Sequence, residues 1–178
     1  MIKRGHLSIL FYCTSLVLLV VLLTGCITIT KKDRSDEPSS EPSSEQTSTP
    51  IHEDLVITLE RTPCFGKCPV YSLKIKGDGT VIYSGVQFVK VTGIQETTIS
   101  IDDVEQLLIE FEQADYFSLD DSYTKFGKSD MPSANTSISL GGQTKSVNHY
   151  HGDLTAPKSL TKLEDRIDEI VNSDQWIK

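Results

Sequence analysis

The stretch YSLKIKGDGTVIY, residues 71–83, decides the fold. Every second residue from Tyr71 to Ile75 is apolar and the residues between are polar, which is the period of a β-strand with one buried face. A Gly-Asp-Gly turn follows, and residues 80–83 are β-branched or aromatic. This stretch therefore predicts a β-hairpin with one solvated face.

Other segments of the chain carry the same signal. Residues 55–59 alternate in the same way, and residues 87–91 and 94–99 are weaker strand candidates. Residues 136–140 and 145–150 flank two consecutive glycines, so they predict a second hairpin. Most of the expected sheet is thus built from strands that are neighbours in sequence.

Two segments have a helical period instead. Ser100 is a suitable N-cap for a helix over residues 101–111, whose apolar side chains fall on one face. Pro157 opens a closing helix of the same kind, after which Trp176 is expected to dock on the core. Strands, helix, hairpin and helix in this order predict an α+β fold, an antiparallel sheet with two helices packed on one face.

The N-terminal segment has the features of a bacterial lipoprotein signal peptide. Lys3 and Arg4 precede an uncharged, largely apolar run over residues 7–23, and the run leads into Leu-Thr-Gly-Cys ending at Cys26. This pattern predicts cleavage after residues 1–25. An uncleaved transmembrane helix is the alternative, and both interpretations leave the remaining chain outside the cytoplasm.

Cys26 is the expected lipidation site. Its sulfur is consumed by a diacylglyceryl group, and further acyl chains such as palmitate hold the protein at the cell membrane. This covalent lipid is the only cofactor-like group that we expect. The membrane is therefore a predicted partner, and the predicted location is the cell envelope, with the domain facing outward.

The chain between the anchor and the fold is a predicted tether. Residues 26–54 include a run of Ser, Pro, Glu and similar polar residues over residues 35–50. Such a run buries too little apolar area to offset the entropy of ordering it. The sequence thus divides into a signal peptide, a disordered tether and an α+β domain over residues 55–178.

Net charge limits the class of partner. The whole chain carries −8, and cleavage removes two positive charges and no acid, so the mature chain carries −10. Nucleic acids bind proteins through basic surfaces, which argues against such a partner. An envelope protein or peptide is the expected partner, with some preference for a basic one.

Two cysteines remain for the folded part. Cys64 and Cys68 are separated by three residues that include a glycine, so the chain between them bends back far enough for a disulfide. Closing so short a loop stabilises the fold by about 2 kcal/mol. A disulfide that fixes the connection between two strands is the first interpretation.

Two chemical roles for the same turn stay open. A thiol-redox site needs a cation that lowers a thiol pKa, and Lys67 or Arg61 is close enough in sequence to supply it. A metal site would add His149 and His151 to the two thiolates, which makes a Cys2His2 set suited to zinc. The first role gives an envelope thiol oxidoreductase and the second a metal-binding protein.

The rest of the sequence points away from catalysis. It contains no nucleophile elbow, P-loop, zincin helix or dinucleotide fingerprint, so we expect a binding domain rather than an enzyme. Arg61, Lys67 and Tyr71 are the candidate binding residues around the cysteine turn. Arg61 is expected to pair with a carboxylate such as Asp130, or to bond the carbonyl groups of the turn.

The segment around the cysteines also resembles a known family. Residues 61–71 read R-T-P-C-x-G-x-C-P-x-Y and residues 77–81 read G-D-G-x-V. Both motifs are similar to those of uncharacterised bacterial envelope domains, and the likeness extends to Trp176. The resemblance implies a domain often found in lipoproteins. It implies no reaction and no catalytic residues.

Overall fold

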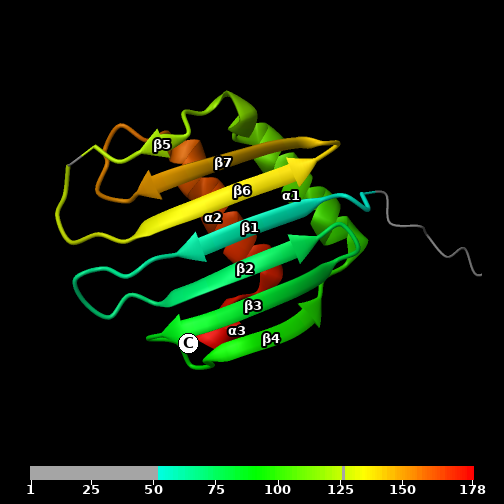
Figure 1. Cartoon of the computed structure of the whole chain (residues 1–178), viewed down its shortest axis with the longest axis horizontal. Helices are drawn as coiled ribbons and strands as arrows, with labels where there is room; N and C mark the ends of the chain where they lie inside the picture. Colours follow the sequence, from blue (N-terminus) through cyan, green and yellow to red (C-terminus); the bar gives the residue numbers. More distant parts are fainter. Residues whose placement is uncertain (1–51, 126) are drawn as a thin grey trace, which may run out of the picture. The chain divides into compact units, whose positions relative to one another are not determined.

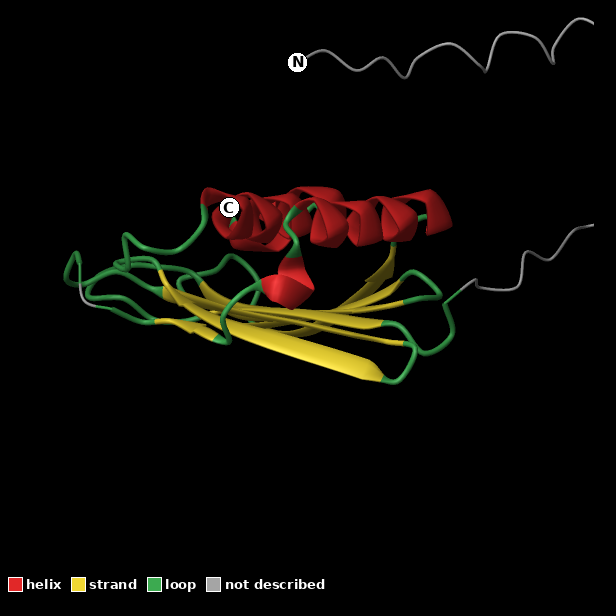
Figure 2. Ribbon diagram, turned by 90° about the horizontal axis from the view of Figure 1, so that it is seen from above, coloured by secondary structure: helices red, strands yellow, loops and turns green. Residues whose placement is uncertain are grey.

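The computed structural model describes residues 52–125 and 127–178. These residues form a seven-stranded sheet with helices on one of its faces, so the predicted α+β fold is confirmed (Figures 1 and 2). The expected signal peptide, Cys26 and the tether up to residue 51 lie outside the described residues.

The sheet has the strand order β4-β3-β2-β1-β6-β7-β5. All neighbouring strands are antiparallel except β5, which runs parallel to β7. β1 lies in the middle and joins the two hairpins. The strands are β1 (Val56–Arg61), β2 (Val70–Lys76), β3 (Thr80–Gln87), β4 (Gly93–Thr98), β5 (Ser122–Tyr123), β6 (Ser133–Leu140) and β7 (Gln143–Tyr150).

Both longer helices cover the same face of the sheet, as Figure 2 shows. Ser100 caps the first of them, because its side chain accepts a bond from the Asp103 amide and the Asp103 carboxylate accepts one from the Ser100 amide. No helix in the described ranges is long and apolar enough to cross a membrane. The helical segments are α1 (Ile101–Gln113), the 3-10 turn η1 (Tyr116–Ser118), α2 (Lys158–Val171) and α3 (Asp174–Ile177).

The core lies between the sheet and the helices. Alternate residues of each central strand point into it, and the intervening Ser, Thr and Lys side chains line the open face of the sheet. This alternation is what makes one face apolar and leaves the other to water. The largest fully buried side chains are those of Tyr83, Tyr116, Leu55, Ile57, Leu59, Leu73, Ile75, Leu107, Ile138, Leu160, Leu163 and Ile167.

Glycines set the tight turn of the β6–β7 hairpin. Gly141 and Gly142 have φ angles of 59° and 75°. Two central residues with positive φ are the requirement of the turn type that matches the twist of a two-residue hairpin. The hairpin predicted around these glycines is therefore confirmed, as is the one around the Gly-Asp-Gly turn between β2 and β3.

One predicted strand is wrong. Residues 87–91 form no strand of their own, because β3 continues to Gln87 and Phe88 then adopts a φ of 55°. The amide of Val91 donates to the carbonyl oxygen of Trp176 at 2.9 Å, so this segment contacts the C-terminal end of the chain rather than another strand. The two-residue strand β5 and the short helix α3 were not predicted.

The folded part begins before the predicted boundary. Residues 52–54, which the sequence assigns to the tether, form a turn in which the Leu55 amide donates to the His52 carbonyl at 3.0 Å. The His52 ring also contacts Glu105 of α1, with Nε2 at 3.2 Å from Oε1. These contacts hold the start of β1 against the helix layer.

Candidate functional site

A row of side chains crosses the sheet near the end of β1. The strand register places Arg61 opposite Tyr71 on one side and Ala134 on the other, and Ala134 opposite His149. Neighbouring strands are about 4.8 Å apart, so these residues form a continuous row on the helix-facing side. Ala134 is small, which leaves room between Arg61 and His149 for side chains from α2.

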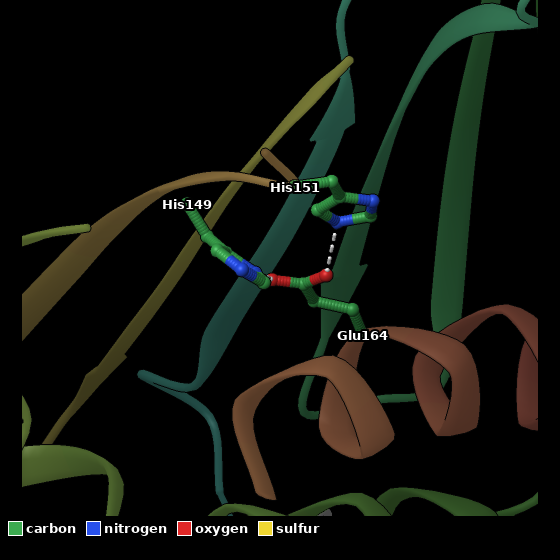
Figure 3. Close-up of side chains that lie close together, drawn as sticks. All are labelled: His149, His151 and Glu164. Atoms are coloured by element: carbon green, nitrogen blue, oxygen red, sulfur yellow. Dashed lines mark hydrogen bonds and ion pairs between the residues drawn. The ribbon is translucent and has the colours of Figure 1, made fainter. Parts of the chain in front are cut away.

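Glu164 of α2 fills that room and is fully buried. Its Oε1 lies 2.8 Å from Nδ1 of His149, and its Oε2 lies 2.8 Å from Nε2 of His151 (Figure 3). A carboxylate only accepts hydrogen bonds, so both ring nitrogens carry a hydrogen. Burial by itself raises the pKa of Glu164, but the bonds from the two histidines outweigh burial and hold the pKa below its ordinary value.

Asp168 lies one helical turn further along α2 and binds the other half of the row. Arg61 donates to its Oδ2 from Nη2 at 2.9 Å and from Nε at 3.3 Å. The hydroxyl groups of Tyr71 and Ser173 both donate to Oδ1, each at 2.7 Å. Burial, followed by the Asp168 charge, raises the pKa of Tyr71, which therefore stays a donor at neutral pH.

Arg61 links the two carboxylates. Its Nη1 lies 3.5 Å from Oε2 of Glu164, and its side chain is only 14% exposed. A third acid, Asp165, lies 3.5 Å from Nη2. One largely buried guanidinium thus contacts three carboxylates of the same helix, which leaves negative charge in excess around it. We call these residues, with Tyr71, His149 and His151, the Arg61 network.

A cleft of about 690 Å³ opens beside the Arg61 network. Its lining includes four acidic side chains but only two side chains that are positively charged at neutral pH, Arg61 and Lys178. The pKa of Asp165 is raised by burial and by the charges of Glu164 and Asp168, which together outweigh the attraction of Arg61. The cleft therefore carries a net negative charge. Its lining consists of Arg61, Cys68, Pro69, Tyr71, Pro132, His151, Asp165, Asp168, Glu169, Asn172, Ser173, Asp174, Ile177 and Lys178.

The cysteine turn forms one edge of this cleft. Cys64 and Cys68 are joined by the expected disulfide, with their Cα atoms 5.7 Å apart, in the connection between β1 and β2. Cys68 and Pro69 line the cleft, whereas the Phe65 side chain at the tip of the turn is 89% exposed. The disulfide thus fixes the chain between the two strands that carry Arg61 and Tyr71.

The structure brings together two of the three candidate binding residues. Arg61 and Tyr71 share Asp168 and face the cleft, whereas Lys67 is exposed in the disulfide turn and does not line the cleft. Arg61 pairs with carboxylates, as one of the two expectations had it, but Asp130 as the example is wrong. Asp130 is exposed in the loop before β6, and the acids of α2 lie directly over Arg61 instead.

The four residues of the candidate Cys2His2 set do not meet. The two sulfurs are bonded to each other, and the two histidines contact Glu164. Among the described residues, the side chains that lie close enough together to hold a metal ion are those of His149, His151 and Glu164. Sequence reasoning missed Glu164 and Asp168. The available signal was that both acids lie among the apolar residues of an amphipathic helix, next to Leu163 and Ile167.

Comparison with known proteins identifies the family. Residues 55–171 match the family described as a domain of unknown function, DUF6438. The chain belongs to this family. The DUF6438 match runs from the start of the sheet to the end of α2 and includes the Arg61 network. It ends before Trp176, to which the resemblance was expected to extend, and no curated protein matches the chain.

Proposed function

We propose that the chain is an exported lipoprotein whose DUF6438 domain binds a cationic segment of an envelope protein or peptide. The cleft beside the Arg61 network is the binding site in this proposal, and no reaction is assigned to it. The observation that carries the proposal is the net negative charge of the cleft. Its lining has four acidic side chains, and Arg61 and Lys178 are the lysine or arginine side chains in it.

Three of those acids are accessible to a ligand. The side chains of Asp165, Glu169 and Asp174 are 63%, 62% and 60% exposed. Glu169 and Asp174 have partners in Arg166 and Lys178, but exposed ion pairs of this kind contribute only about 0–1 kcal/mol and exchange readily. Lysine or arginine side chains of a ligand would replace these partners and relieve the repulsion at Asp165.

The position of the cleft suits a tethered receptor. β1 starts beside His52, the first described residue, and ends at Arg61, at the opposite end of the sheet (Figure 1). Arg61 lines the cleft, which therefore lies at the end of β1 away from His52. A tether that enters at one end of the sheet leaves the other end free for a partner. The acidic, Ser- and Pro-rich composition of residues 26–51 supports such a tether.

Replacing Cys26 with alanine is expected to abolish lipid attachment. Cells labelled with a palmitate analogue should incorporate label into the wild-type chain and none into Cys26→Ala, which should move from the membrane fraction to the soluble fraction or keep an unprocessed N-terminus. Cys13→Ala is the matched control and should remain labelled, because Cys13 lies within the expected signal peptide. Label that persists in Cys26→Ala would refute the anchor.

Neutralising the cleft is expected to weaken partner capture. The variant Asp165→Asn/Glu169→Gln/Asp174→Asn should retain fewer proteins from envelope extracts than the wild type, and the lost partners should carry basic segments. Stability should change by at most about 0.5 kcal/mol per site, because all three side chains are exposed.

The control for this capture experiment is Glu53→Gln/Glu96→Gln/Glu112→Gln. These three acids are exposed and lie outside the cleft, so the change in net charge is identical. The proteins that each variant binds are identified by mass spectrometry at several salt concentrations and compared with those bound by the wild type. Equal capture by both variants, or capture of acidic partners only, would contradict a cationic ligand in the cleft.

A further inference from the structure

We propose that His149, His151 and Glu164 form a binding site for one divalent transition-metal ion, with Zn²⁺ as the best match. His151 lines the cleft, His149 and Glu164 are buried, and the site does not use the disulfide cysteines. It does not depend on the peptide ligand proposed above.

The three side chains converge on one point. One nitrogen of each histidine and a carboxylate oxygen of Glu164 all lie within 4.8 Å of one another (Figure 3). Tetrahedral zinc with bonds of about 2.0–2.1 Å holds its ligands roughly 3.4 Å apart. An ion takes the place of the two hydrogen bonds when each neutral imidazole carries its hydrogen on the other ring nitrogen, so that the nitrogen facing Glu164 offers a lone pair. The side chains then need only small rotations. The existing hydrogen bonds hold the three groups in place for it.

The backbone positions these ligands firmly. His149 and His151 are two residues apart, so both rings lie on the helix-facing side of β7 and the residue after it. Glu164 approaches from the middle of α2, and Tyr123 of β5 packs edge-on against His149 with ring centroids 6.4 Å apart. Ligands on a strand and a helix, with one ring fixed by a neighbour, form a more rigid site than ligands on loops.

The charge around the site calls for a divalent cation. Glu164, Asp165 and Asp168 carry three negative charges, and Arg61 is the cation in contact with all three. An ion of charge +2 balances that excess. Arg61 stands close to Glu164, but its shortest contact is to Asp168, so its charge is already shared with another carboxylate.

The ligand types select the class of metal. Two imidazole nitrogens and one carboxylate oxygen suit zinc and similar transition metals, whereas calcium and magnesium prefer sets made only of oxygen. His151 is 20% exposed and lines the cleft, which gives the ion a path inward. The same opening leaves a fourth coordination position for water or for a donor group of a bound ligand.

The test is a zinc titration of the full-length chain in mild detergent against a chromophoric chelator. We expect one equivalent of Zn²⁺ to bind and the temperature of unfolding to rise with free Zn²⁺ until the site saturates. Co²⁺ in place of Zn²⁺ should give the visible absorption of a four-coordinate site with nitrogen and oxygen ligands. These wild-type measurements decide the question even if a variant fails to fold.

Variants then locate the site. His151→Gln should weaken zinc affinity by at least about tenfold, and it should fold because His151 is partly exposed. Glu164→Gln should weaken affinity similarly. His52→Gln is the matched control, since His52 also contacts a glutamate, Glu105, but lies on another part of the surface, and its affinity should be unchanged. Absence of zinc binding by the folded wild type, or equal affinity in His151→Gln, would overturn the site.

Discussion

Arg61→Ala is expected to lower the free energy of unfolding by about 3–5 kcal/mol. The side chain is mostly buried and contacts Glu164, Asp165 and Asp168. Removing it leaves the Glu164 carboxylate with its two histidine donors and the Asp168 carboxylate with its two hydroxyl donors, but takes away the cation that both share. The cost of keeping these largely buried negative charges without their cation exceeds the value of the ion pair itself. Urea denaturation followed by circular dichroism measures the change.

Two controls separate charge from geometry at this position. Arg61→Lys keeps the charge but cannot bridge two carboxylates with one planar group, so it should lose an intermediate amount of stability. Lys74→Ala removes an exposed cation from the open face of the sheet and should change stability by less than about 0.5 kcal/mol. A loss below about 1 kcal/mol for Arg61→Ala would show that the carboxylates do not depend on Arg61.

Trp176→Ala is expected to cost about 3–5 kcal/mol of stability and to open one wall of the cleft. Trp176 is buried and stacks on Tyr83 of β3, with ring centroids 4.7 Å apart and an interplanar angle of 23°. Its carbonyl oxygen also accepts the bond from Val91. The indole therefore holds α3, which supplies Asp174 and Ile177 to the cleft.

The control for Trp176→Ala is another aromatic truncation. Phe65→Ala removes a ring that is almost fully exposed, so thermal and urea unfolding should change little. Trp176→Phe should recover part of the loss because a ring still stacks on Tyr83. If Trp176→Ala unfolded at the same denaturant concentration as the wild type, the proposed packing of α3 on the sheet would be wrong.

Local patterns were sufficient to predict most of the sheet. Alternation over β1, β2 and β6 identified their buried faces, and paired glycines identified the β6–β7 turn. Two features depend on distant contacts and gave no local signal. β5 has only two residues and exists because it pairs with β7. After Gln87 the chain leaves the sheet, where Phe88 has a positive φ and Val91 bonds to Trp176.

The candidate site was predicted only in part, for a related reason. Arg61 and Tyr71 stood out because they flank the cysteine turn. Glu164 and Asp168 did not, because acids four residues apart on a helix usually mark a face in water. Their place among the apolar residues of α2 was a weak signal, and the register, which puts Arg61 and His149 on either side of Ala134, supplies the partners that these acids face. Non-local strand pairing of this kind cannot be inferred from one sequence.

Binding of a cationic segment in the cleft is tested most directly by titrating the full-length chain with a fluorescent lysine-rich peptide and measuring anisotropy. We expect saturable binding that weakens with salt, and an affinity at least about tenfold lower, or about 1.4 kcal/mol, for Asp165→Asn/Glu169→Gln/Asp174→Asn. The control variant with three acids neutralised outside the cleft should bind like the wild type. Equal affinities for the two triple variants, or no binding at peptide concentrations up to about 1 mM, would contradict the proposed function.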